Sequence, residues 1–215
     1  MRPLPILYRD ERLAVVDKPP GLLSVPDAGA GARSVPELLA AQGLRALGVH
    51  RLDREVSGVL LVALDEEALQ LLQDLFRAHA VEKVYWGMAA GHVEPPAGQL
   101  TFPILEEPGG ARVSARGKPA RTRYRTLVRH RLASELELTL DTGRKNQIRV
   151  HLAHAGHALV GERKYARGRD AVLALRSRRV ALHAWRLRLR VPWTGTELAV
   201  EAPLPEDLRE LQGRA

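Results

Sequence analysis

The stretch VHRLDREVSGVLLVAL, residues 49–64, places a charged cluster directly before an uninterrupted apolar run. The apolar run from 57 to 64 is short, and it is typical of a buried strand. Charged side chains at the mouth of a core strand are held rigidly, which is what a catalytic group requires. Asp53 is therefore a candidate catalytic group. A turn in which Asp53 only accepts backbone hydrogen bonds explains the same residues equally well.

On the N-terminal side of this stretch the sequence predicts two strands, a loop and a helix. Residues 6–8 and 13–17 are apolar enough for short strands, and KPPGLLSVP at 18–26 follows them as an irregular apolar loop. A capping box at 34–37 predicts a helix that stops at Gly43.

On the C-terminal side, Asp65 is placed to cap a second helix, because two glutamates and an apolar stripe follow it. EKVYWGMAAG at 82–91 predicts a strand. A third helix is predicted to begin near Asn146 and to end at Gly156.

The second half of the chain is mostly β. Residues 120–126, 134–141 and 185–191 alternate between apolar and polar side chains, which predicts antiparallel strands with one solvated face. Together with the helices, these strands predict an α+β fold: a central, mostly antiparallel mixed β-sheet flanked by helices and loops.

Composition restricts the function further. The 215 residues contain 33 Lys and Arg against 25 Asp and Glu, for a net charge of +8. Such a balance favours a polyanionic partner. Only five of the 33 basic residues are Lys, and the excess of Arg reflects either bidentate recognition of phosphates and bases or a GC-rich genome. The absence of Cys excludes disulfides, thiolate catalysis and Cys-based zinc sites. We expect one domain over 1–215, in the cytoplasm, because the sequence contains neither a signal peptide nor an apolar run of membrane-spanning length.

Basic residues gather at the start of the third predicted helix. Arg144, Lys145 and Arg149 follow the flexible Gly143, and helix N-termini bind anions. A solvated basic helix is the alternative interpretation. The same choice applies to the stripe of Arg186 and Arg188 on the strand at 185–191, which is either an RNA contact or a solvated outer face.

Two ligand motifs are considered and rejected. His151, His154 and His157 are spaced by three, but they lack the glutamate of the zinc-protease helices, and we predict no metal site. Gly29 and Gly31 lack the third glycine and the preceding strand of a nucleotide-binding loop, so no nucleotide cofactor is expected.

Six blocks of the sequence together resemble the RluA family of pseudouridine synthases. HRLDREVSG at 50–58 is similar to the signature that carries that family's catalytic aspartate. The other blocks, in the family's order, are KPPGLLSVP (18–26), KVY (83–85), GKPARTRY (117–124), TGRKNQIRVHLAHAGHALVGERKY (142–165) and LHAWRL (182–187). The resemblance spans nearly the whole chain, and it implies the pseudouridine synthase fold with an RNA-binding cleft.

The resemblance also implies roles for individual residues. Asp53 matches the catalytic aspartate, Tyr85 the tyrosine that stacks on the uracil, and Arg149 the arginine that pairs with the aspartate. Arg51 matches the arginine that fills the gap left by the extruded base. The residues that we expect to bind the RNA substrate are Arg51, His50, Arg144, Lys145, Lys83, Arg186 and Arg188.

Four positions depart from the family pattern: Val56, Asn146, Ala158 and Glu162, where Thr, His, Pro and Asp are common. The implied activity is isomerisation of uridine to pseudouridine in structured RNA, in 23S ribosomal RNA stem-loops, transfer RNA stem-loops or both. We expect no cofactor, no membrane association, a monomer, and no separate N-terminal S4 RNA-binding domain. The alternatives are a non-catalytic RNA-folding factor and a hydrolytic N-glycosidase.

Overall fold

A computed structural model describes residues 3–27, 33–166, 175 and 177–215, and the Gly29–Gly31 spacing considered above lies outside them. The chain divides into two compact units. The first contains Met1–Lys83 and Ala184–Leu204, and the second contains Val84–His183 and Pro205–Ala215. Each unit is described by itself below.

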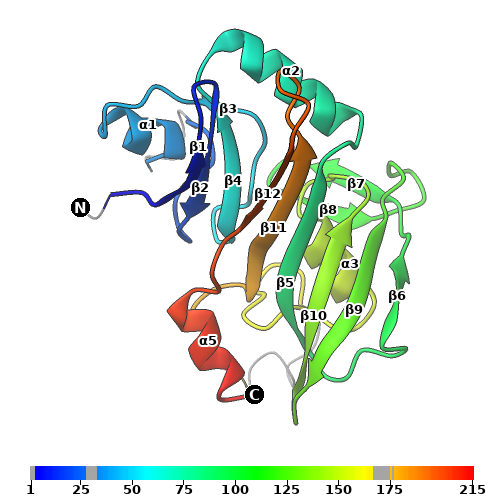
Figure 1. Cartoon of the computed structure of the whole chain (residues 1–215). Helices are drawn as coiled ribbons and strands as arrows, with labels where there is room; N and C mark the ends of the chain where they lie inside the picture. Colours follow the sequence, from blue (N-terminus) through cyan, green and yellow to red (C-terminus); the bar gives the residue numbers. More distant parts are fainter. Residues whose placement is uncertain (1–2, 28–32, 167–174, 176) are drawn as a thin grey trace. The chain divides into compact units, whose positions relative to one another are not determined.

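The strands of the first unit follow the order β1-β2-β4-β11, with β3 beside β4 and β12 beside β11 (Figure 1). Their bounds are β1 Ile6–Arg9, β2 Leu13–Lys18, β3 Leu47–Gly48, β4 Ser57–Ala63, β11 Leu182–Arg190 and β12 Glu197–Glu201. The unit boundary falls within β11, before Ala184. The strands predicted at 6–8, 13–17, 57–64 and 185–191 are confirmed.

Two capped helices accompany this sheet, and both caps agree with the sequence prediction. α1 (Val35–Ala40) carries the capping box of Ser34 and Glu37. α2 (Glu66–Arg77) begins where the Asp65 side chain accepts a hydrogen bond from the Ala68 N–H at 2.7 Å. A carboxylate in this position satisfies one of the unpaired N–H groups of the first turn.

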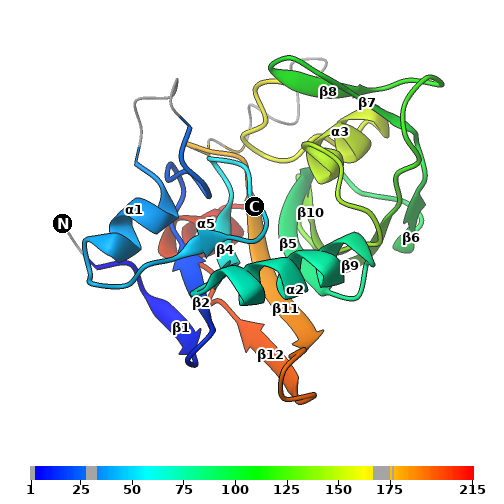
Figure 2. The same ribbon diagram turned by 90° about the horizontal axis from the view of Figure 1, so that it is seen from above.

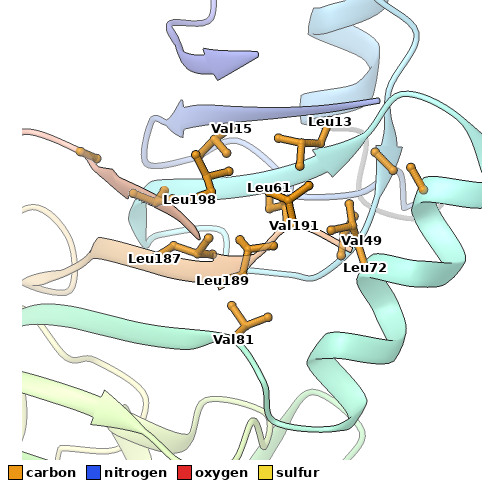
Figure 3. Packing of buried hydrophobic residues seen from close by; sticks show 14 residues of the cluster. Leu13, Val15, Val49, Leu61, Leu72, Val81, Leu187, Leu189, Val191 and Leu198 are labelled. Atoms are coloured by element: carbon orange, nitrogen blue, oxygen red, sulfur yellow. The ribbon is translucent and has the colours of Figure 1, made fainter. Parts of the chain in front are cut away.

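The core of the first unit is aliphatic, and every residue of its central cluster is less than a tenth exposed. Leu13 and Val15 of β2 meet Leu61 of β4, and the alternate residues Leu187 and Leu189 of β11 pack into the same cluster (Figure 3). From Leu187 to Arg190, β11 alternates between buried leucine and exposed arginine, so this part of the strand has one dry and one wet face.

The strands of the second unit follow the order β5-β10-β9-β6, and all of these pairings are antiparallel. A separate hairpin is formed by β7 and β8. The bounds are β5 Glu82–Ala90, β6 Ala97–Leu100, β7 Ile104–Glu107, β8 Gly110–Val113, β9 Thr122–Arg129 and β10 Ala133–Leu140. The unit boundary falls within β5, after Lys83.

The helices of the second unit are α3 (Gln147–His154), which lies against the β7–β8 hairpin, and α5 (Glu206–Gln212) (Figure 2). The prediction of α3 is confirmed at both ends, with Asn146 as its N-cap and Gly156 just past its C-cap. α5 is held at its start by a bidentate pair between Arg179 and Asp207. The α+β class is confirmed. Within the part of the chain that the structure describes, none of the helices is long and apolar enough to cross a bilayer.

Candidate active site

Asp53 lies in the loop between β3 and β4 of the first unit and is half-buried. Its carbonyl accepts the Val56 N–H at 3.0 Å, so residues 53–56 form a tight turn that leads into β4. A turn of this kind fixes the backbone of Asp53 at the entrance of a strand whose residues are all buried. The rigid setting that the sequence predicted for Asp53 is therefore present.

Ser24 clamps the residue that precedes Asp53. Its hydroxyl accepts the Leu52 N–H at 2.8 Å and donates to the Leu52 carbonyl at 2.9 Å. Ser24 is buried, and a buried backbone group without a partner is costly, so both bonds favour this one loop conformation. Sequence reasoning assigned no role to Ser24.

The residue that follows Asp53 is held by the same segment. The Arg54 carbonyl accepts the Gly21 N–H at 2.7 Å and a hydrogen bond from the Lys18 Nζ at 3.3 Å. The fully buried Lys18 ammonium also donates to the Leu22 carbonyl at 2.9 Å. Asp53 is thus flanked on both sides by backbone that the KPPGLLS segment restrains.

Gly58 allows the backbones of β4 and β11 to approach each other closely. It has a φ of +114°, and a Cβ built there would lie 2.1 Å from the Ala184 carbonyl oxygen. Any side chain at this position would collide with the β11 backbone. The glycine of the HRLDREVSG block is therefore required by packing within the first unit.

His50 is held by structural contacts. Its Nε2 accepts the Leu61 N–H at 3.0 Å, and its ring stacks on Phe76 at 4.5 Å between centroids. Burial, and next the charge of Lys83, lower the pKa of His50 to about 3, so the ring is neutral at physiological pH. A neutral ring with an occupied Nε2 is suited to supporting β4, and the RNA contact expected for His50 remains an untested prediction.

Lys83 and Arg51 belong to the same unit. The Lys83 Nζ lies 5.7 Å from the centroid of the Phe76 ring, on which His50 also stacks. Arg51 is exposed and directly precedes the clamped Leu52. The loop therefore presents one exposed guanidinium two residues before Asp53.

Tyr85 and Arg149 lie in the second unit. Tyr85 is a buried residue of β5 and pairs across the sheet with Leu138 of β10. Arg149 is buried in the first turn of α3 and makes a bidentate ion pair with Glu162, at 2.7 Å from Nε and 2.9 Å from Nη2. A guanidinium carries five N–H groups, so this pair does not exhaust it.

Gln147 fixes the start of α3. Its side-chain amide donates to the Arg121 carbonyl and to Thr122, and its carbonyl oxygen accepts from the Arg144 N–H and Thr142. Asn146 precedes it with a φ of 53°, a left-handed conformation that asparagine tolerates better than most residues. Through its hydrogen bonds Gln147 anchors the 142–147 turn to the unit, and sequence reasoning gave Gln147 no role.

Arg144 and Lys145 connect this turn to the β7–β8 region. The Arg144 Nε donates to the Pro119 carbonyl at 3.1 Å, and the Lys145 N–H donates to Glu106 at 3.2 Å. Lys145 is exposed and Arg144 is half-buried. Two basic side chains thus gather near the N-terminus of α3, which is a setting that suits an anion.

The two arginine stripes differ in their surroundings. On β9, Arg123 and Arg125 form cross-strand ion pairs with Asp141 and Glu137 at 2.9 and 3.1 Å. On β11, Arg188 is exposed opposite Ala199, and Arg186 lies over the Trp185 ring at 4.0 Å. Both β9 arginines thus pair with carboxylates, whereas on β11 Arg186 lies opposite Glu201 and Arg188 lies opposite an alanine.

The three spaced histidines have separate partners. His151 is bonded to Thr122 and the Phe102 carbonyl, His157 to the Ala90 carbonyl, and His154 packs against the Phe102 ring. Burial lowers the pKa of His151, although the Phe102 carbonyl acts in the opposite direction. In the described part of the chain, the His, Asp and Glu side chains form no group suited to a metal ion.

Solved structures with the same fold define the class to which this architecture belongs. The chain matches Human RNA Pseudouridylate Synthase Domain Containing 4 with a TM-score of 0.82 and 28% identity, over 98% of this chain and 92% of that one. It matches Human RNA Pseudouridylate Synthase Domain Containing 1 with a TM-score of 0.80 and 25% identity, over 98% and 90%. The fold is that of the pseudouridine synthases.

Sequence comparison then gives the family. Residues 12–154 match the family model described as RNA pseudouridylate synthase, and the chain belongs to this family. It is 38% identical to Ribosomal large subunit pseudouridine synthase D of Nitrosomonas europaea, over 97% of this chain and 64% of that protein. It is 36% identical to the protein of the same name from Escherichia coli (strain K12), over 97% and 69%. The chain thus spans about two thirds of the length of these relatives.

Proposed function

We propose that the protein is an RNA pseudouridine synthase, an isomerase that converts uridine to pseudouridine in stem-loops of ribosomal RNA, transfer RNA or both. The observation that carries the proposal is the Asp53 loop. Its carboxylate sits at the mouth of a buried strand, and both neighbouring residues are restrained by hydrogen bonds. Rigid positioning of a reactive group is what catalysis requires of a loop.

In the proposed reaction, the uracil leaves the ribose by breaking its C1′–N1 bond and returns through a C1′–C5 bond. The C5 proton is lost and N1 gains one, so no co-substrate is consumed. Asp53 acts as the nucleophile or base, and Arg149 pairs with it and orients it. Tyr85 stacks on the detached uracil and holds it while it turns.

The uridine must leave the RNA stack before Asp53 can reach it. We propose that the exposed Arg51 fills the space that the base vacates. Arg144, Lys145, Lys83, Arg186 and Arg188 are proposed to contact RNA. We propose that residues 1–215 act as one catalytic domain, as a monomer in the cytoplasm.

The test is release of tritium from ribosomal and transfer RNA labelled at C5 of uridine, because this proton is lost in the isomerisation. The expected result is tritium release with pseudouridine in the RNA digest, and none from Asp53→Asn. Free uracil in place of pseudouridine would indicate an N-glycosidase. Tight RNA binding without any release would indicate an RNA-folding factor.

A further inference from the structure

Glu162 is a buried carboxylate that the proposed mechanism does not use. Its side chain is 0% exposed, and that of its partner Arg149 is 8% exposed. Burying a carboxylate is costly unless charge and hydrogen bonds compensate for it. A charged group kept in this position therefore calls for an explanation.

Both oxygens of Glu162 are engaged. One accepts the Arg149 Nε, and the other accepts the Arg149 Nη2 together with the N–H groups of Lys164 and Tyr165, at 2.8 and 3.2 Å. Burial alone would raise the pKa of Glu162, but the hydrogen bond and charge of Arg149, followed by the two N–H groups, outweigh it and lower the pKa. Glu162 is thus ionised, and its charge is directed at Arg149.

Tyr165 restrains the same guanidinium from its face. The Arg149 Cζ lies 5.3 Å from the centroid of the Tyr165 ring. The Tyr165 hydroxyl donates to Asn146 Oδ1 at 2.7 Å and accepts the Ala111 N–H at 3.2 Å. The guanidinium is therefore fixed along one edge by Glu162 and over one face by an anchored ring.

We propose that Glu162 is a positioning residue, which holds the Arg149 guanidinium in the orientation that catalysis needs. The inference rests on the proposed function, in which Arg149 orients Asp53. A flexible arginine side chain loses rotamer entropy when it is ordered. The ion pair with Glu162 orders the Arg149 side chain before RNA binds. The entropy loss therefore does not add to the activation barrier of the reaction.

The substitutions Glu162→Gln and Glu162→Asp separate charge from shape. Glutamine keeps the size, but its amide places a donor against the donors of Arg149. Aspartate keeps both oxygens and the charge. We expect Glu162→Gln to lower the single-turnover rate by about 10–100-fold, since small misplacements near the chemistry cost that much. The KM for RNA should change less than three-fold, and Glu162→Asp should lie about ten-fold closer to wild type.

The control, matched in hydrogen-bond geometry, is Asp207→Asn in the same unit, where the carboxylate side chain is 50% exposed. Arg179 and Asp207 form the same bidentate arrangement, at 2.6 and 3.0 Å, and that pair anchors α5. Asp207→Asn should lower the melting temperature while leaving the rate of the folded enzyme within about two-fold. If Glu162→Gln does not fold, Glu162→Asp is compared with Asp207→Glu in its place.

A double-mutant cycle tests whether Glu162 acts through Arg149. Adding Glu162→Gln to Arg149→Lys should cost little more than Arg149→Lys alone, because residues that act as a unit are not additive. The inference is overturned if the losses multiply, or if Glu162→Gln slows the folded enzyme no more than Asp207→Asn does. A wild-type protein that makes no pseudouridine would instead refute the proposed function.

Discussion

The loop that carries Asp53 and the side chain of Arg149 are restrained by different kinds of contact. In the first unit, the backbone before and after Asp53 is restrained by hydrogen bonds with the Ser24 hydroxyl, the Gly21 N–H and the buried Lys18 ammonium. In the second unit, Arg149 is held directly through its charged group by a buried carboxylate, Glu162.

The difference follows from what each side chain needs. An aspartate has only two side-chain torsions, so fixing its backbone already confines the carboxylate to a small region. A long arginine stays mobile on a fixed helix, so its guanidinium requires a partner of its own. The comparison predicts that substitutions around Asp53 act by loosening the loop backbone. Substitutions around Arg149 should act by leaving a buried charge without its partner.

The largest effect is expected at Asp53. Asp53→Asn keeps the shape of the side chain but removes the charge, so pseudouridine formation should fall below detection. RNA affinity, measured by filter binding, should stay within a few-fold of wild type. Substantial turnover by the pure variant would contradict the proposed function.

Arg149→Met should cause the largest loss of stability. It leaves the Glu162 carboxylate buried without its cation, and the free energy of unfolding should fall by about 3–5 kcal/mol in urea melts. Arg149→Met combined with Glu162→Gln should recover part of that loss. The control, Arg123→Met in an exposed pair with Asp141, should cost under about 1 kcal/mol. Equal losses in the two single variants would argue against a buried pair.

Ser24→Ala tests the other region. Both the N–H and the carbonyl of Leu52 lose their hydroxyl partner, which should cost about 1–3 kcal/mol and lower kcat several-fold. Ser34→Ala is a matched control, because Ser34 is also a buried serine but belongs to the α1 capping box. Ser34→Ala should lower the stability but leave kcat unchanged. If the two variants lower kcat equally, the clamp has no specific effect on Asp53.

His50 should make the stability of the first unit depend on pH, so that the unit becomes less stable as the pH falls. The folded ring resists protonation with a pKa of about 3, whereas the unfolded chain takes up a proton below about pH 6.5. Stability is therefore fully present above about pH 6.5 and falls with pH, by about 2 kcal/mol at pH 5. His50→Gln should flatten that slope, because glutamine does not titrate in this pH range. An unchanged slope in His50→Gln would assign the acid sensitivity to other groups.

The smallest effect is expected on the arginine stripes. Arg188→Glu on β11 should weaken RNA binding and reduce the log–log salt slope by about 0.7 for each phosphate that the protein no longer neutralises. Arg125→Glu on β9 should do less, because Arg125 already pairs with Glu137. Identical slopes in wild type and Arg188→Glu would show that the β11 stripe is a solvated face.

Sequence patterns predicted the long elements well and the short ones poorly. The capping box at Ser34 and the cap at Asp65 are local devices, and both are present. The four-residue strands β6, β7 and β8 were not predicted, because AGQL, ILEE and GARV carry weak strand preference. α5 was also missed, although Glu206, Asp207 and the spacing of Leu208 and Leu211 could have indicated it.

The sequence by itself determined the fold class, the family resemblance and the candidate residues Asp53, Tyr85 and Arg149, because periodicity, caps and motif order are properties of neighbouring residues. Only the tertiary structure decided which groups hold them. Ser24 lies 28 residues from Leu52, and Glu162 lies 13 residues from Arg149. Such partners meet through folding of the chain, and no local pattern distinguishes a serine or glutamate that will be buried against a distant residue from one that will be solvated.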